Sequence, residues 1–517
     1  MLNTEEFVQK LKNLIGKELE THKEYPKVHY MKVSRARVEP IARLMRKAGA
    51  MLQGIFGADQ RESFELNYFF SLDNFRTDFT FLFRTEVDKR AQISSITRIF
   101  ACATQFETEL TNRLGVEFAK ASQVAEEEEH YLCAPYNLMV GANDYNLFQF
   151  GVFNQIHKNN SYFEFNIAEN RIKDLEIKTG WQYRGIQPLL ESVDVFQPNI
   201  PVLNRISGLS CFHHQLAFYL GLEELLEISI PNKANYIRCF LAELERIQNH
   251  LIWFNNLLVL LGYDKKYSFL TVKWAEFMEL FELINQKPNL SGLVSLGSAK
   301  EIDNISARKI QGLLQATIPP VINSLYEVIY TDFTREKTEN VAIVSMEDAL
   351  TAGYTGPNLR ASGVPYDIRH SSPYLNYVRG AVSQLWDVVS FTRGDVFARI
   401  QTRYWELKHS YEICQYLIEE LTTSFRKLEP LSLRDQDQKL PANELVISRV
   451  EAPHGVLLWY LKTNPEEEVN TLDTVRIMTP ELFNVAGLQR AGLRGARLSN
   501  VPLIIHSTDL SFLELDL

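Results

Sequence analysis

The chain has 517 residues, of which 45% are hydrophobic and 23% are charged, a composition typical of folded globular proteins and unlike that of disordered chains. Its 54 basic and 64 acidic residues give a formal net charge of −10, and no long basic stripe offsets it, which argues against nucleic acid as a partner. The five cysteines are scattered and form no Cys-x-x-Cys pair, so we expect no disulfide framework and no zinc or iron–sulfur site, and a reducing, cytoplasmic setting is favoured.

The N-terminal part of the chain predicts a small domain that mixes helices and strands. An amphipathic pattern over residues 4–19 predicts a helix, and no apolar core of the kind found in secretory signals accompanies it. Aromatic and aliphatic residues alternate with polar ones over 64–84, which predicts strands. A helical pattern follows over 96–118 and is closed by Gly115. An acidic run then predicts a solvated linker over residues 126–140.

Beyond this linker, strands are followed by long helices. Residues 147–177 alternate in runs around a short polar turn, which predicts a hairpin. Helical periodicity then predicts long helices over 232–263, 305–330 and 394–428. Alternation returns from Glu451 onward and predicts a small sheet that closes the domain.

The length of the chain predicts more than one domain, because single cores rarely grow so large. The most apolar window, 251–263, is shorter than the ~20 residues that a membrane span needs, so we expect no transmembrane helix. The predicted fold class is α+β. A small N-terminal mixed α/β domain over residues 1–125 precedes a large, mainly helical domain over residues 141–517, which combines a bundle of long helices with a peripheral β-hairpin sheet.

Two groups of charged residues predict polar networks. The stretch "RASGVPYDIR" places Arg360, Asp367 and Arg369 within ten residues, and pairing of guanidinium with carboxylate would fix their geometry. This group either binds a ligand or forms a structural lattice of ion pairs, and both readings stay open. The second group lies at helical spacing on the longest predicted helix and comprises Glu243, Arg246 and His250. Such spacing predicts a network between helices.

Five motif-bearing stretches follow one another in the second predicted domain. They are "NRISGLSCFHHQLAF", "TGPNLRASGVPYDIRHSSPY", "GDVFARI", "EAPHGVLLWYLK" and "IIHSTDLSFLELDL". The first and last resemble the two cysteine motifs of nickel–iron hydrogenase large subunits. The second and third resemble stretches that energy-converting hydrogenases share with the 49-kDa-type subunit of respiratory complex I, and the fourth is similar to a Glu-Ala-Pro-Arg-Gly strand of the same family.

A further stretch, "FETELTNRLGVEF", lies in the N-terminal domain and resembles the signature of the complex I 30-kDa-type subunit. The resemblance therefore implies a 30-kDa-like domain over 1–125 fused to a 49-kDa-like, hydrogenase-large-subunit-like domain over 141–517. Formate hydrogenlyase large subunits and the fused C–D subunits of bacterial complex I have this arrangement.

The positions that carry the metal in the hydrogenases have lost their thiolates here. The four matching positions are Ser207, Ser210, Ser511 and Glu514. A serine hydroxyl is scarcely ionised at neutral pH, so it is a poor ligand for nickel or iron. We therefore expect no metal at this site and no hydrogenase activity. Cys211 lies one residue beyond the first motif and is expected to pack as a small buried hydrophobe.

The resemblance to complex I implies a quinone where the hydrogenases hold their metal. A tyrosine of that family falls at Gly208, which has no phenol, and a hairpin histidine falls near His157, which is otherwise an exposed turn residue. By resemblance, the residues that line or brace the cavity are Arg205, His214, Arg360, Asp367, Arg369, Asp395, Arg399, His454 and Asp509. Among them, His454 replaces a family arginine and is either a titrating group or a structural histidine.

The resemblance leaves two functions open. In the first, the chain is a core peripheral-arm subunit of a membrane-associated complex related to NADH-quinone oxidoreductase and energy-converting hydrogenase. Its metal-free cavity would serve quinone or another electron acceptor, and the chain would hold no other cofactor. It would dock a partner iron–sulfur subunit and antiporter-like membrane subunits on the cytoplasmic, inner face of the membrane. In the second, it is a non-catalytic structural or coupling remnant of an ion- or proton-translocating complex.

Overall fold

The computed structural model describes residues 11, 28–60, 62–73, 78–119, 147–150, 162–180, 183–197, 200–377, 382–424, 439–466, 469–515 and 517. These residues form two compact units. The first comprises the described residues of Met1–Trp181, Ser345–Tyr354 and Leu482–Leu498, and the second those of Gln182–Val344, Thr355–Glu481 and Ser499–Leu517. The predicted linker over 126–140, His157 and, apart from Leu11, the helix predicted over 4–19 lie outside the described residues.

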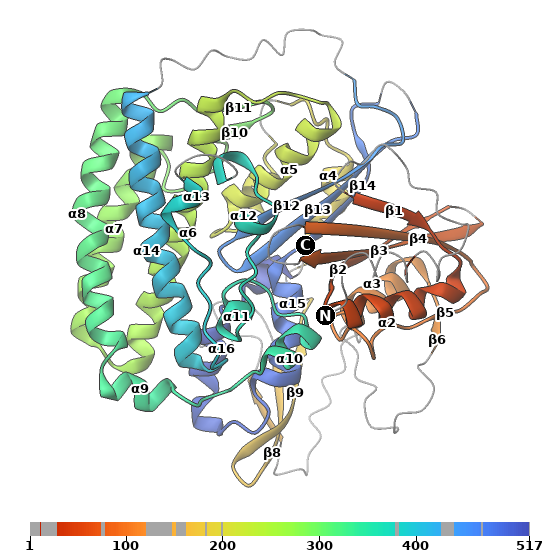
Figure 1. The fold of residues 1–517 in the computed structure, drawn as a ribbon, viewed down its shortest axis with the longest axis horizontal. Helices are drawn as coiled ribbons and strands as arrows, with labels where there is room; N and C mark the ends of the chain where they lie inside the picture. Colours follow the sequence, from red (N-terminus) through yellow and green to blue (C-terminus); the bar gives the residue numbers. More distant parts are fainter. Residues whose placement is uncertain are drawn as a thin grey trace. The chain divides into compact units, whose positions relative to one another are not determined.

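A four-stranded sheet is the framework of the first unit (Figure 1). Its strands are β1 (Val28–Lys32), β2 (Met51–Asp59), β3 (Ser63–Asp73) and β4 (Asp78–Asp88), in the order β1-β4-β3-β2. Strand β1 is parallel to β4, and the other neighbours are antiparallel. The strands predicted over 64–84 are thus confirmed as β3 and β4. The successive residues Phe69 and Phe70 are both buried, so both faces of β3 are covered.

Two helices accompany this sheet, α2 (Val38–Ala48) and α3 (Ala103–Leu114). Helix α3 packs closely on β2, because a Cβ atom at Gly57 would lie 2.5 Å from Cδ2 of Leu110. The helix predicted over 96–118 is confirmed in part: it begins later, and it ends before Gly115, whose φ of 77° gives the left-handed cap.

The predicted hairpin over 147–177 is also confirmed within the first unit. Strands β7 (Leu147–Phe150), β8 (Tyr162–Ala168) and β9 (Arg171–Lys178) form an antiparallel sheet. The β8–β9 turn has positive φ at Glu169 and Asn170, as tight hairpins require. The short elements of this unit are η2 (Arg35–Arg37), β5 (Ile93–Ser94), β6 (Phe118–Ala119), α10 (Met346–Ala352) and η5 (Leu488–Gly492).

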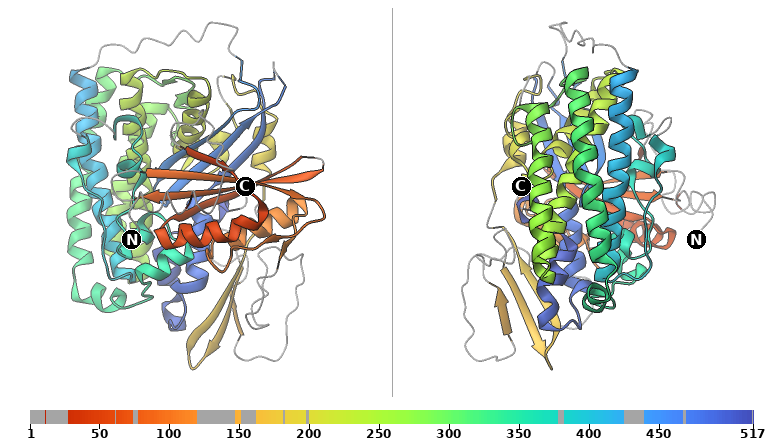
Figure 2. Two further views of the ribbon diagram at one scale, coloured as in Figure 1. Left: turned by 45° about the vertical axis from the view of Figure 1, so that its right-hand side comes forward. Right: turned by 90° about the vertical axis from the view of Figure 1, so that its left-hand side faces the viewer.

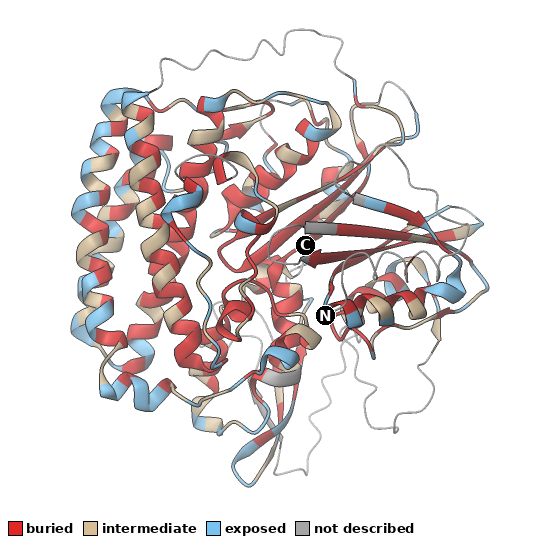
Figure 3. Ribbon diagram, viewed as in Figure 1, coloured by how far each residue is buried: buried red, intermediate tan, exposed pale blue. Residues whose placement is uncertain are grey.

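Four long helices dominate the second unit and run side by side in both views of Figure 2. They are α6 (Asn232–Leu261), α7 (Asp264–Asn285), α8 (Asn304–Ile329) and α14 (Val396–Thr423), so the three long helices predicted from periodicity are confirmed. Helix α6 is buried along most of its length, whereas α7 is exposed over much of its surface (Figure 3). The Asp395 carboxylate caps α14 by accepting a 2.8 Å hydrogen bond from the Ala398 amide.

The second unit also contains the predicted C-terminal sheet. Strands β12 (Leu445–Ala452), β13 (Gly455–Thr463) and β14 (Leu472–Met478) are antiparallel, and α5 (Cys211–Leu225) packs against β12 and β13. The described fold is therefore α+β, as predicted. The remaining described elements of the chain, of which α15 and η6 have residues in both units, are α4 (Ile186–Glu191), η3 (Leu203–Arg205), β10 (Val294–Ser295), β11 (Ser298–Ala299), α9 (Asp332–Thr338), α11 (Gly356–Ala361), α12 (Ile368–Ser371), η4 (Leu375–Tyr377), α13 (Val382–Leu385), α15 (Pro480–Gly487), η6 (Leu498–Asn500), α16 (Val501–Thr508) and η7 (Phe512–Glu514).

Among the described residues, no helix combines the length and the apolar character that a membrane span requires.

Candidate functional site

The first and last motifs lie next to each other in the second unit, although about 300 residues separate them. Arg184 connects them, because its guanidinium donates hydrogen bonds to the carbonyl oxygens of Arg205 (2.6 Å), Ile206 (2.7 Å) and Leu513 (2.8 Å). Ser207 and Ser210 are buried at the start of α5, and Glu514 is buried in η7. The frame of the site is therefore present, and hydrogen bonds from the Arg184 side chain to main-chain carbonyl groups hold it.

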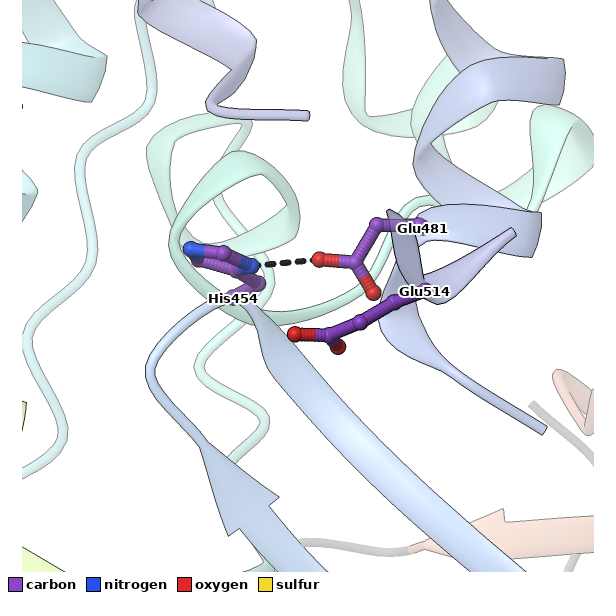
Figure 4. Close-up of side chains that lie close together, drawn as sticks. All are labelled: His454, Glu481 and Glu514. Atoms are coloured by element: carbon purple, nitrogen blue, oxygen red, sulfur yellow. Dashed lines mark hydrogen bonds and ion pairs between the residues drawn. The ribbon is translucent and has the colours of Figure 1, made fainter. Parts of the chain in front are cut away.

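Three ionisable side chains meet at this frame, and Figure 4 shows them: His454, Glu481 and Glu514. His454 occupies the turn between β12 and β13, Glu481 lies in the first turn of α15, and Glu514 lies in η7. One ligand atom of each side chain lies within 4.8 Å of the other two. All three residues are buried, with exposed fractions of 3%, 0% and 2% respectively. We refer to these three residues as the His454 cluster.

The local backbone explains how His454 is held. A Cβ atom on Gly356 would lie 2.4 Å from the His454 carbonyl oxygen, so only glycine allows α11 to approach the β12–β13 turn this closely. The Thr355 hydroxyl oxygen accepts a 3.1 Å hydrogen bond from the Val456 amide on the other side of the turn. The Thr479 hydroxyl donates to the Glu514 carbonyl oxygen at 2.8 Å, which ties η7 to the segment that leads into α15.

Further side chains surround the His454 cluster. Nδ1 of His454 hydrogen-bonds to the Glu481 carboxylate, and its Nε2 lies 3.4 Å from Oδ2 of Asp509. On the other side, Nε2 of His214 lies 3.6 Å from Oε2 of Glu514. Nε of Arg403 lies 3.6 Å from the Asp509 carboxylate, so one guanidinium balances that charge.

The proximity of these charges shifts the pKa values of the cluster. Burial disfavours the imidazolium, but the carboxylates of Asp509 and Glu481 outweigh it and raise the pKa of His454 to about 10. Burial and the neighbouring Glu514 raise the pKa of Glu481 to about 8. Burial also acts on Glu514, but contacts with His214, His454 and Ser207 lower its pKa to about 2. The carboxylates of Glu481 and Glu514 thus repel each other. In the absence of a bound cation, Glu481 is the one that is protonated at neutral pH.

A second buried cluster is centred on Arg360 in α11. Its guanidinium donates to Glu406 (2.9 Å) and to Glu451 (2.7 Å), and it lies 3.3 Å from Asp367. Arg369 pairs with Asp367 at 2.7 Å, so the two arginines and the carboxylate of "RASGVPYDIR" lie in one network. We refer to these five residues as the Arg360 cluster.

Helix α6 extends this network. Arg369 donates to Glu243 at 2.9 Å, and the Ser410 hydroxyl donates to the other carboxylate oxygen of Glu243 at 2.6 Å. Although burial opposes its charge, Arg369 and Arg246 lower the pKa of Glu243 to about 2. His250 connects α6 to the Arg360 cluster, because its Nε2 lies 3.2 Å from Oε2 of Glu406. The predicted helix–helix network of Glu243, Arg246 and His250 is thus present and buried.

Other residues of the predicted site lie elsewhere. Arg205 and Gly208 are exposed and lie outside the buried clusters, and their place at the predicted cavity stays a prediction. Arg399 braces α16 through a 3.0 Å hydrogen bond to Ser507, whereas Asp395 serves as a helix cap. Ser511 is half-buried. Cys211 is buried, and burial raises the pKa of its thiol well above the usual value, as for a structural cysteine.

The sequence reasoning missed several residues in or beside these clusters, among them Arg184, Glu481, Arg403 and Glu406. Glu406 and Arg403 are three residues apart on a predicted helix, next to a recognised motif, and this spacing was an available signal. Glu481 and Arg184 belong to no motif, and only the folded chain shows their contacts.

The donor atoms at the former ligand positions do not fit a nickel–iron centre. That centre needs four thiolates, whereas Ser207, Ser210, Ser511 and Glu514 offer hydroxyl and carboxylate oxygens. Among the described cysteines, Cys211 is the nearest in sequence, and its thiol is protonated and buried. No step through a nickel–iron group can be assigned to these residues.

Comparisons with known proteins agree on one family. Residues 292–517 match the family model of the respiratory-chain NADH dehydrogenase 49 Kd subunit, and residues 31–126 match that of the 30 Kd subunit. A subunit of the F(420)H(2) dehydrogenase of Methanosarcina mazei is 30% identical over 300 residues, which cover 56% of this chain and 77% of that protein. A subunit of the NADH-quinone oxidoreductase of Chloroherpeton thalassium is 27% identical over 353 residues, covering 64% of this chain and 78% of that protein.

A hydrogenase and a solved structure also match. The carbon monoxide-induced hydrogenase of Rhodospirillum rubrum is 24% identical over 350 residues, which cover 67% of this chain and 92% of that protein. A chain from the structure of the membrane-bound sulfane sulfur reductase, an archaeal respiratory membrane complex, has a TM-score of 0.63 and 24% identity, covering 72% of this chain and 98% of that one. The latter likeness concerns the fold.

Proposed function

This chain belongs to the family of the respiratory-chain NADH dehydrogenase 49-kDa subunit, with a 30-kDa-type domain fused ahead of it, and we propose that it is a core subunit of a membrane-associated oxidoreductase complex. In this proposal it lies in the peripheral arm, on the cytoplasmic face of the membrane. A partner iron–sulfur subunit supplies electrons, antiporter-like membrane subunits lie below it, and a quinone or another small acceptor binds at the former metal position.

One observation carries this proposal. The two halves of the former metal site are still held together by the guanidinium of Arg184, although the thiolates are gone. Hydroxyl and carboxylate oxygens occupy the former thiolate positions, and the imidazoles of His214 and His454 are buried beside Glu514. A frame maintained without thiolates favours a function that uses the position and its charges, as acceptor binding does, over hydride chemistry at nickel.

The first motif also offers a way for partners to approach. Arg205 and Gly208 are exposed in the described chain, directly beside the buried Ser207. No atom lies within 4 Å of the position that a Cβ on Gly208 would take. This loop is therefore the part of the first motif that a partner subunit or an acceptor would contact.

The alternative function is a structural or coupling remnant without catalysis, and two observations favour it. Gly208 provides no phenol where the complex I family has a tyrosine, and the charges of the Arg360 cluster are extensively paired with one another. A chain that only transmits conformational change needs neither an acceptor nor a free proton donor.

The test compares the complex that carries native chain with complexes that carry Gly208→Trp or Gly312→Trp. Both glycines are exposed and have open space around a Cβ, but Gly312 lies on the outer surface of α8. Each complex is isolated through a tag on this chain, and binding of a short-chain quinone analogue and its reduction by the complex are measured. We expect Gly208→Trp to weaken binding at least tenfold and Gly312→Trp to leave it unchanged.

Two outcomes would refute the acceptor-binding function. If the native complex retains its iron–sulfur partner but binds no quinone analogue and reduces none, the coupling remnant is favoured. If nickel is present at one atom per chain, our interpretation of the serine positions is wrong. Mass spectrometry of the isolated complex identifies the partner subunits in the same preparation.

A further inference from the structure

The His454 cluster has the composition of a metal site, although it contains no sulfur. An imidazole nitrogen and two carboxylates, from the β12–β13 turn, α15 and η7, converge with ligand atoms within 4.8 Å of one another (Figure 4). We propose that His454, Glu481 and Glu514 bind one divalent transition-metal cation, such as Zn²⁺ or Mn²⁺. Glu514 occupies one of the four former nickel–iron ligand positions, but the three ligands offer nitrogen and oxygen rather than sulfur, so the proposed site is not a nickel–iron centre. The proposal replaces the expectation of a metal-free site and does not depend on the proposed oxidoreductase function.

Two carboxylate oxygens of the cluster have no partner of their own. Oε2 of Glu481 and Oε1 of Glu514 make no hydrogen bond in the structure. Bulk water does not reach them either, because the two side chains are only 0% and 1% exposed. A buried carboxylate oxygen without a partner costs free energy, and natural proteins rarely leave two of them together. A cation between the two carboxylates would satisfy both oxygens and remove their mutual repulsion.

The surrounding residues are those that a bound cation needs. If the cation takes Nδ1 of His454, the imidazole is neutral and its Nε2–H is free to donate to Asp509, whose carboxylate lies 3.4 Å away. A carboxylate on the far nitrogen is the usual support of a metal-bound histidine, since it fixes the ring and raises the basicity of the ligand. Nε2 of His214 lies 3.6 Å from Oε2 of Glu514, so a small shift would let it donate a hydrogen bond to the second ligand.

The donor atoms also decide the class of cation. One nitrogen and two oxygens suit zinc, manganese or ferrous ions, and the absence of thiolate among these three ligands disfavours the softer copper(I). Ligands that lie about 2.1 Å from one ion are at most about 4.2 Å apart. The three ligand atoms lie within 4.8 Å of one another, so small side-chain shifts are sufficient to place them around one ion. Three protein ligands leave at least one position for water or another small ligand.

The charges are consistent with a divalent ion. With a neutral His454, the two carboxylates carry two negative charges, which one divalent cation neutralises. The competing arrangement keeps the site metal-free, with an imidazolium and a proton on Glu481 in place of the ion. The experiment below separates these two occupants.

The test uses the full chain, produced with Zn²⁺ or Mn²⁺ in the medium and purified without chelator, as native chain and as Glu481→Gln, Glu514→Gln and Glu301→Gln. Glu301 is a matched control because it is a carboxylate of the second unit that pairs with Lys233, outside the cluster. Metal content is measured by plasma mass spectrometry, and affinity by titration of the chelator-treated chain with Mn²⁺ or Zn²⁺. Zinc X-ray absorption spectra report the ligand atoms.

We expect one ion per native chain and per Glu301→Gln chain, bound through nitrogen and oxygen. We expect each cluster variant to bind at least tenfold more weakly, while circular dichroism shows that it is folded. The proposal is overturned if native chain contains no ion in either medium and shows no saturable binding. It is also overturned if the Gln variants bind as native chain does, or if the spectra show sulfur ligands.

Discussion

The His454 cluster and the Arg360 cluster lie in the same unit and are equally buried, but their charges are balanced in opposite ways. In the Arg360 cluster, every carboxylate has a guanidinium within 3.3 Å. In the His454 cluster, two carboxylates face each other and share one imidazole. Burial alone therefore does not determine what an ionic cluster does. A paired lattice stabilises one structure, whereas an unbalanced one can bind a cation or a proton.

The largest effect is expected where the paired lattice loses its centre. Arg360→Met leaves Glu406, Glu451 and Asp367 buried with one cation fewer, and we expect the free energy of unfolding to fall by about 3–5 kcal/mol. Urea denaturation of the full chain measures this loss. The surface pair of the exposed Arg393 and the half-buried Glu339 is the matched control, because Arg393→Met should cost less than about 1 kcal/mol. Equal losses in both variants would show that the buried lattice contributes nothing special.

A second prediction concerns the pH dependence of the paired lattice. The folded-state pKa of Glu243 is lowered to about 2, below the unfolded value near 4.5, because Arg369 and Arg246 outweigh burial. A depressed carboxyl pKa adds stability that is present above the unfolded value and is lost as the pH falls through the folded one. Glu243→Gln should therefore lose about 3 kcal/mol at pH 7 and differ less from native chain near pH 2. Denaturation between pH 7 and pH 2 tests this window, and a constant difference would contradict it.

A third prediction concerns Glu107 in the first unit, a buried carboxyl group whose pKa is raised rather than lowered. Its contribution to stability should therefore change with pH in the direction opposite to that of Glu243. Burial raises the pKa of Glu107 to about 7, with hydrogen bonds from Ser95 and the Ile96 amide opposing the shift. A raised carboxyl pKa lowers stability as the pH rises from the unfolded value near 4.5 to about 7. We expect Glu107→Gln to remove this decline and to stabilise the chain by up to about 3 kcal/mol above pH 7. Thermal unfolding of native chain and of Glu107→Gln between pH 5 and pH 8 tests this expectation. If stability falls with rising pH as steeply in the variant as in native chain, the expectation is wrong.

The smallest effect is expected in the unbalanced cluster itself. In the presence of chelator at pH 8, Glu481→Gln removes the repulsion between two carboxylates, so we expect a gain of about 1 kcal/mol. Glu406→Gln, a carboxylate that pairs with Arg360, should lose stability under the same conditions. Urea denaturation measures the change in the free energy of unfolding for both variants. A gain for Glu481→Gln with a loss for Glu406→Gln would confirm that the two clusters differ in charge balance, and a loss for both variants would contradict it.

Periodic patterns in the sequence were sufficient for most of the fold. The stripe of aliphatic residues along α6 and the alternation in β3 and β4 predicted these elements, because their side chains repeat with the period of the structure. Which segments belong to which unit was harder to predict from the sequence. Residues 162–180, 345–354 and 482–498 group with the first unit, although the predicted boundaries place them in the second domain, since contacts such as Ile172 N to Ala496 O (2.9 Å) join segments far apart in sequence.

Only those residues of the site that belong to a recognised motif could be predicted from the sequence. The resemblance led directly to Ser207, Ser210 and Glu514, and to His454 as a replaced residue. Glu481 follows a proline at a helix start, and nothing in its neighbourhood announces that its carboxylate meets His454. Burial of a charged group depends on which distant segments pack against it, and the local sequence around that group does not reveal this packing.

The guanidinium of Arg184 also has a kinetic consequence. It joins carbonyl groups that are 21 and 329 residues away along the chain, so these bonds can form only after two widely separated segments have met. Closing so long a loop is entropically costly, and contacts of this range usually form late in folding. We expect the two halves of the former metal site to join as one of the last steps of folding, after the long helices have assembled. A refolding chain would then pass through a stage in which its helices are complete and its site is still open.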